Sequence, residues 1–132
     1  MALYALGDLH LSLNSNKSME IFGDGWQDYV SRLKDAFSAL GPEDVTVLCG
    51  DLSWGMSLEQ AEQDFAFLDG LPGRKILLKG THDYWWTTAA KMERFFAEHG
   101  FSTLEILHNN CRLYGELAPV SYTHLTLPTN SL

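Results

Sequence analysis

The order of hydrophobic and polar positions along the chain predicts three short strands. Apolar residues run almost without interruption through Ala2–Leu6, Val45–Cys49 and Lys75–Leu78. A glycine follows each run, either directly or one residue later. A short apolar run that ends at such a turn residue is typical of a strand whose two faces are both buried.

Between these strands, hydrophobic positions recur with the period of an α-helix. We expect helices over Trp26–Leu40, Ser57–Leu68 and Thr87–Glu98, where apolar side chains return every three or four residues. The second helix opens with Ser57 and, three residues later, Gln60, which is the spacing of a capping box. Strands that alternate with helices pair in parallel through right-handed crossovers, so the pattern predicts an α/β fold with one parallel-rich sheet.

The C-terminal part of the pattern differs from the rest. After Gly100, the segments Thr103–Leu107 and Arg112–Tyr114 flank a polar turn and predict a hairpin. The 132 residues otherwise fit one domain, without an internal repeat or a linker.

Composition and charge exclude several classes of protein. The formal net charge is -8, and a negative surface repels a phosphate backbone, so strong nucleic-acid binding is not expected. No apolar stretch reaches the length of a membrane span, and Met1–Leu6 lacks the features of a signal peptide. Cys49 ends an apolar run and is expected to be a buried thiol. A cytoplasmic protein without a membrane partner fits best, and its oligomeric state stays open.

The residues that follow each predicted strand carry the candidate chemistry. Asp8 and His10 follow the first strand, Asp51 the second, and His82 and Asp83 the third. The carboxyl ends of parallel strands meet at one edge of the sheet, where ligands bind. Carboxylates and neutral imidazoles are ligands for Zn, Mn and Fe ions. Singly, such an aspartate is more often a turn former or helix cap, and such a histidine a surface or core residue. Their recurrence at three strand ends favours a metal site.

These motifs resemble those of a known family. Gly7–His10, Gly50–Asp51 and Gly80–Asp83 are similar in order and spacing to the D-x-H, G-D and G-N-H-D motifs of calcineurin-like metallophosphoesterases. The resemblance implies that the sheet and its helices are the N-terminal half of a four-layer αββα sandwich. It also implies a metal-dependent phosphoester hydrolase, with two divalent ions (Mn, Fe or Zn) and attack by a metal-bound hydroxide on a phosphorylated substrate of unspecified type.

The resemblance also implies a role for each matching residue. Asp8 and His10 would hold the first metal ion, and Asp51 would bridge both ions. His82 would be the catalytic group beside the phosphorus, and Asp83 would orient the His82 ring through a hydrogen bond. The alternative from a different class is a noncatalytic α/β domain that binds a phosphate or nucleotide at helix N-termini.

The sequence departs from the family pattern in two places. Thr81 stands where the family has an asparagine whose amide oxygen ligates the second ion, so we expect weaker binding of that ion. The family completes its site with later Gly-His motifs, and no Gly-His pair occurs in this chain. We therefore expect the chain to be a truncated form that is inactive as it stands.

The C-terminal residues suggest where the sequence of the phosphoesterase domain is interrupted. Ser121–Thr129 resembles the translation of an adapter used in short-read sequencing libraries. We expect a partial phosphoesterase domain over residues 1–118 and a non-native tail over residues 119–132, with a natural polar terminal strand as the alternative.

Two further groups of residues have less specific interpretations. Trp54, Tyr84, Trp85 and Trp86 follow ligand motifs and either line a pocket beside the metals or pack at a helix start. Glu59, Glu62 and Asp64 are expected on an ordinary solvated helix face.

Overall fold

The computed structural model describes residues 2–13 and 28–108. The strands are β1 (Leu3–Leu6), β2 (Val45–Leu48), β3 (Arg74–Leu77) and β4 (Leu104–Ile106). The helices that connect them are α1 (Tyr29–Phe37), α2 (Glu62–Gly70) and α3 (Ala89–His99).

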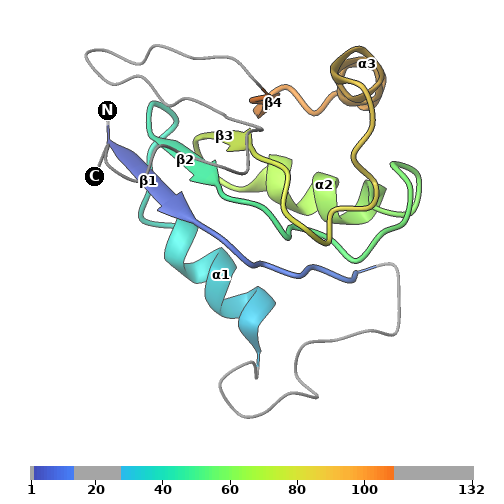
Figure 1. Ribbon diagram of the computed structural model, residues 1–132. Helices are drawn as coiled ribbons and strands as arrows, with labels where there is room; N and C mark the ends of the chain where they lie inside the picture. The colour runs from blue at the N-terminus through green and yellow to red at the C-terminus, as the bar shows by residue number, and fades with distance from the viewer. Residues whose placement is uncertain (1, 14–27, 109–132) are drawn as a thin grey trace, which may run out of the picture.

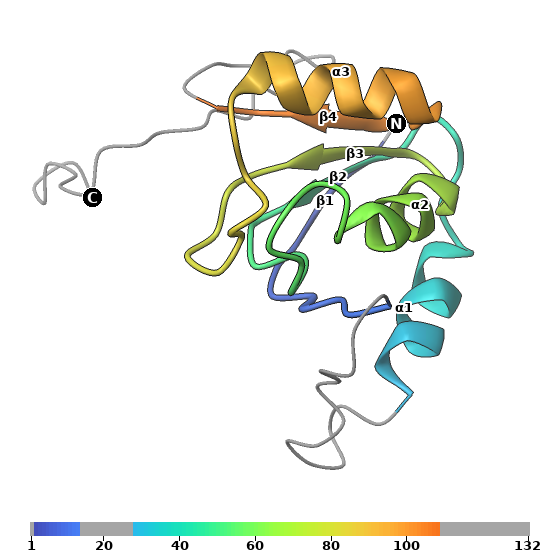
Figure 2. The same cartoon turned by 90° about the vertical axis from the view of Figure 1, so that its right-hand side faces the viewer.

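The four strands form one parallel sheet in the order β1-β2-β3-β4 (Figure 1). One helix connects each strand to the next, and crossovers of the same hand that advance in the same direction leave their helices on the same face. The two views agree with this arrangement, because α1, α2 and α3 all lie along one side of the sheet (Figure 2). The prediction of an α/β fold with a parallel sheet and flanking helices is confirmed.

The main core lies between this face of the sheet and the helices. The buried side chains of the core come from all three helices and from alternate positions of the strands, including Phe37, Leu48, Phe65, Leu68, Leu77, Met92, Phe95, Phe96, Leu104 and Ile106. A smaller cluster of Val45, Val47, Ile76 and Leu107 uses the opposite strand positions and therefore marks the second face of the sheet.

Local signals set the helix ends, with some shift from the predicted bounds. The Thr88 hydroxyl accepts a hydrogen bond from the Lys91 N–H and begins α3, and Gly100 ends it at a φ of 72°. The capping-box residues do meet, because the Gln60 N–H donates to the Ser57 hydroxyl at 3.2 Å. They cap a separate turn, however, and α2 starts later, at Glu62.

Two details of the strand predictions are wrong. β1 is largely exposed rather than buried on both faces, because it lies at the edge of the sheet. Cys49 is exposed because it lies past the last paired residue of β2. Leu104–Ile106, within the first half of the expected hairpin, forms β4 and pairs in parallel with β3, and the hairpin itself stays a prediction. The other half of that expected hairpin, Arg112–Tyr114, lies outside the described residues.

A buried lysine stabilises the end of the sheet where β3 begins. The Lys75 side chain has no exposed surface, and its Nζ donates to the carbonyl oxygens of Leu71, Gly73 and Asp69, the last two at 2.6 and 3.4 Å. Burial lowers the pKa of Lys75 to about 8, although the charge of Asp69 acts in the opposite direction. The last turn of α2 and the start of β3 are thereby held together by one ammonium group.

Within residues 2–13 and 28–108, each helix is too short and too polar to cross a bilayer.

Candidate metal centre

The loops that follow β1 and β2 run side by side beyond the last paired residues of the sheet. The backbone N–H of Asp8 donates to the carbonyl oxygen of Gly50 at 3.1 Å, and that of His10 donates to Asp51 at 2.9 Å. The ligand motifs therefore lie on backbone that is fixed by hydrogen bonds rather than on free loops. As expected, the motifs after β1 and β2 meet at one edge of the sheet.

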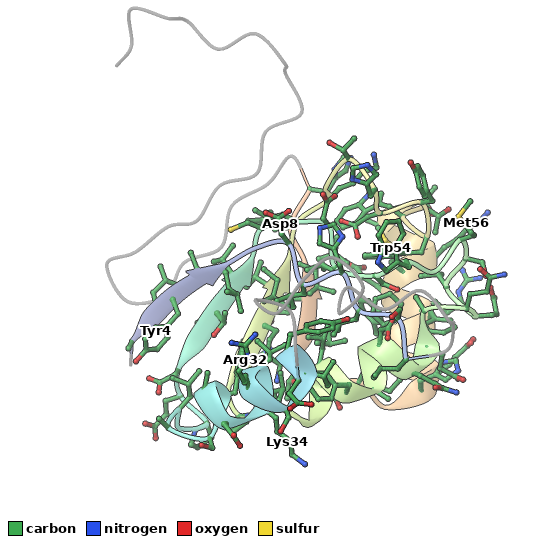
Figure 3. The ribbon with its side chains drawn as sticks, turned by 90° about the horizontal axis from the view of Figure 1, so that it is seen from below. Tyr4, Asp8, Arg32, Lys34, Trp54 and Met56 are labelled. Atoms are coloured by element: carbon green, nitrogen blue, oxygen red, sulfur yellow. The ribbon has the colours of Figure 1, made fainter. Side chains whose placement is uncertain are left out.

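The three predicted metal ligands come together here. Asp8, His10 and Asp51, which we call the ligand group, each offer an atom within 4.8 Å of the other two. The His10 Nε2 lies 3.9 Å from an Asp8 carboxylate oxygen, and the Asp8 side chain is 74% exposed (Figure 3). One cation could reach all three side chains with small rotamer changes, since two carboxylates and an imidazole form a common donor set for transition metals.

The backbone under the ligand group is strained. Among the described residues, only four other than glycine have a positive φ, and three of them are Asp8 (58°), His10 (47°) and Asp51 (52°). The left-handed region costs a side-chain-bearing residue on the order of 1 kcal/mol, and such strain clusters at functional sites. The three residues with strained backbone are the same three whose ligand atoms lie within 4.8 Å of one another.

Two glycines allow the second and third motifs to approach each other. A Cβ on Gly80 would lie 2.2 Å from the Asp51 nitrogen, and a Cβ on Gly50 would lie 2.6 Å from the Gly80 Cα. Contacts this short are forbidden to real side chains, so both positions require glycine. Gly50 and Gly80 therefore have a steric role in bringing the loops after β2 and β3 together.

His82 lies directly over Asp51. Its backbone N–H donates to one Asp51 carboxylate oxygen at 2.8 Å, and its Nδ1 lies 3.1 Å from the other. Partial burial acts to raise the pKa of Asp51, but these hydrogen bonds and the nearby imidazoles of His82 and His10 outweigh it, so the pKa of Asp51 lies below its ordinary value. Asp51 is therefore ionised at neutral pH, as a metal ligand must be.

Asp83 occupies a different position from the one expected. Its carboxylate is buried and accepts hydrogen bonds from the backbone N–H groups of Asp51 (2.7 Å), Leu52 (2.8 Å) and Gly80 (2.7 Å) and from the Trp85 indole (3.0 Å). Within the described part of the chain, its hydrogen bonds do not include one to the His82 ring. Asp83 joins the loop after β2 to the loop after β3, and its assignment as a catalytic residue stays a prediction.

Sequence reasoning missed a second buried carboxylate that supports the site. Asp64 on α2 was expected on a solvated face but is only 2% exposed. It accepts hydrogen bonds from the Leu13 N–H at 2.9 Å and the Ser53 hydroxyl at 2.5 Å, so it connects the two loops that carry the ligand group. Burial raises the pKa of Asp64, although these two hydrogen bonds lower it in part. The signal available in the sequence was the position of Asp64 next to Phe65 and four residues before Leu68, on the buried side of α2.

The four aromatic residues that follow the ligand motifs were expected either to line a pocket beside the metals or to pack at a helix start, and the structure has two of each kind. Trp85 is buried and packs edge-on against Phe65, with ring centroids 4.8 Å apart, and the half-buried Trp86 lies against it. Trp54 and Tyr84 lie beside the metal centre instead: the Trp54 ring is 5.6 Å from His10, and the Tyr84 ring is 6.2 Å from His82.

Comparison with known proteins agrees with this architecture. The model of the calcineurin-like phosphoesterase family matches residues 1–125. This range extends into residues 119–132, and the domain boundary at residue 118 stays a prediction. Among curated protein sequences none matches the chain.

One solved structure has a similar fold. It is the crystal structure of a protein of unknown function, AQ665, from Aquifex aeolicus, with 21% sequence identity and a TM-score of 0.50. The match covers 89% of this chain and 58% of that protein, so the chain spans little more than half of its length. The family match extends over nearly the whole sequence, and the chain belongs to the calcineurin-like phosphoesterase family.

Proposed function

We propose that the protein is a phosphoester hydrolase that works with two divalent cations, Mn, Fe or Zn, and that this chain carries the binding residues for the first of them. The observation that carries the proposal is the ligand group, in which Asp8, His10 and Asp51 from two different loops lie within 4.8 Å of one another. Family membership supports the same activity.

The donor set fits a divalent metal ion. It combines two carboxylates with one imidazole, and the strained backbone of all three residues has no evident structural benefit. Bound cations would neutralise the phosphate oxygens and lower the pKa of a water molecule, which is what hydrolysis of a phosphate ester requires.

His82 and Asp51 supply the neighbouring protein chemistry. The His82 side chain is 48% exposed and faces the Asp51 carboxylate through Nδ1, so its Nε2 is available on the other side of the ring. We assign His82 as the group that stabilises or protonates an ester oxygen, since an imidazole exchanges protons near neutral pH.

The second cation needs ligands beyond those of the ligand group. Asp51 would be shared by both ions, but Thr81 replaces the family's asparagine and the chain lacks the Gly-His motifs. We therefore propose that this chain binds one ion and does not turn over substrate, and that residues 119–132 are not part of the native domain.

Calorimetric titration with Mn²⁺ tests the proposal. We expect one ion per chain, with binding lost in Asp51→Ala and kept in Asp35→Asn, which changes an exposed carboxylate on α1. An aryl phosphate with added Mn²⁺ should be hydrolysed only after the chain is extended with its missing ligand motifs. If the chain binds inorganic phosphate equally well with and without a chelator, the noncatalytic phosphate-binding alternative is correct instead.

A further inference from the structure

An apolar surface borders the metal centre on one side. Tyr84 is 54% exposed and Met56 is 59% exposed, and both are among the few large hydrophobic side chains on the described surface. Trp54, half-buried, lies between the Asp8 side of the site and Met56 (Figure 3). We call Trp54, Met56 and Tyr84 the apolar rim.

The rim is in contact with the catalytic side of the site. The Trp54 ring lies 6.4 Å from the His82 ring, and Tyr84 meets the same imidazole edge-on at 6.2 Å. Both aromatic residues follow ligand motifs by one to three positions, so they are fixed to the same two loops as Asp51 and His82. If the phosphate of an ester is bound at the ligand group, the organic part of that ester would extend away from the metal ions and pass beside these rings.

Tyr84 takes little part in the described core. Trp85, the next residue, is 2% exposed and fills the core, whereas most of the Tyr84 ring faces solvent. An exposed tyrosine and a half-buried tryptophan, whose rings lie 6.2 and 6.4 Å from the same imidazole, each offer a flat apolar face, which suits a planar ring better than an alkyl chain.

We propose that the organic group of the substrate is a flat aromatic ring, either a nucleobase or a simple aryl group, which stacks on Trp54 and Tyr84 of the apolar rim. This inference rests on the proposed function, because the phosphate must be held at the ligand group. The rim selects the ester by the shape of its leaving group, while the metal centre supplies the chemistry common to all phosphate esters.

Binding measurements on the Mn²⁺-loaded chain test the proposal without requiring turnover. Phenyl phosphate should bind about tenfold more tightly than ethyl phosphate, the size expected for one aromatic stacking contact. Adenosine monophosphate compared with ribose 5-phosphate gives the same test for a nucleobase, and the pair with the larger ratio identifies the source of the ring.

Matched variants locate the effect. Tyr84→Ala should reduce the preference for the ring, because only Trp54 is left to stack on it, while Tyr84→Phe should keep the preference. Tyr4→Ala removes a tyrosine of comparable exposure on β1, remote from the site, and should also keep it (Figure 3). Trp54→Leu should reduce the preference without loss of Mn²⁺ binding.

The outcomes separate this inference from the function beneath it. If inorganic phosphate binds to the Mn²⁺-loaded chain but each aromatic ester binds only as well as its non-aromatic partner, the stacking surface is overturned and the metal site stands. If inorganic phosphate does not bind at all, both proposals are overturned.

Discussion

Asp83 and the ligand group lie at the same edge of the sheet, and they differ in what their carboxylate oxygens do. The Asp83 carboxylate is buried and its lone pairs are taken up by backbone N–H groups and an indole, including those of Leu52 and Trp85. The ligand group is partly exposed, stands on strained backbone, and turns carboxylate oxygens of Asp8 outward. Position after a strand does not distinguish the two.

The difference teaches how to separate structural from functional carboxylates. A carboxylate has about four acceptor positions, and Asp83 fills its own with protein donors, so nothing is left for a ligand. The ligand group keeps its acceptors available at a cost in backbone strain. Removing Asp83 should therefore affect folding, and removing a member of the ligand group should affect binding.

The largest expected effect is that of Asp83→Ala. The change leaves the N–H groups of Asp51, Leu52 and Gly80 and the Trp85 indole without their acceptor, and unfolding should become easier by about 4 kcal/mol or more. Chemical denaturation followed by tryptophan fluorescence measures it, with Asp83→Asn as a milder variant that keeps one acceptor. A loss below about 1 kcal/mol would remove the distinction drawn above.

Gly80→Ala should separate the loop that carries Asp83 from the loop that carries Asp51. The new methyl carbon would lie 2.2 Å from the Asp51 nitrogen, so the loops must separate, at a cost of about 3 kcal/mol and with loss of Mn²⁺ binding. Gly70→Ala at the end of α2 is the control, because nothing lies within 4 Å of its new carbon. Equal thermal midpoints for the two variants would contradict the steric argument.

Lys75 extends the comparison to a buried ammonium group at the other end of β3, whose N–H donors all have carbonyl acceptors. Because its folded pKa of about 8 lies below the ordinary 10.5, the unfolded chain binds more protons between these values, and stability should rise with pH across that window. From pH 7 to pH 10 the gain should be on the order of 2 kcal/mol. Denaturation midpoints of the parent and Lys75→Met at both pH values measure it, since the variant should lose this slope.

Asp8→Asn should change stability least and sharpen the contrast most. Asparagine tolerates the positive φ of this position, and the side chain is largely exposed, so the free energy of unfolding should move by less than about 0.5 kcal/mol. Mn²⁺ affinity should nevertheless fall by about tenfold or more, because a charged ligand is lost. Titration calorimetry and a melting curve on the same sample provide both values.

Much of the candidate site could be predicted because its signals are local in sequence. Asp8, His10, Asp51 and His82 each follow an apolar run by a few residues, and parallel pairing brings the ends of such runs to one edge. The role of Asp64 could not be predicted in the same way, because its partners, Leu13 and Ser53, lie 51 and 11 residues away.

The sequence by itself determined the alternation of strands and helices, the parallel sheet and the residue types that meet at its edge, since hydrophobic period and glycine positions are written along the chain. Only the tertiary structure decided that β1 is an exposed edge, that Asp83 faces the backbone instead of His82, and that Trp85 is buried while Tyr84 is not. These outcomes depend on which neighbours occupy the space around each side chain, and neighbours distant in sequence leave no periodic signal.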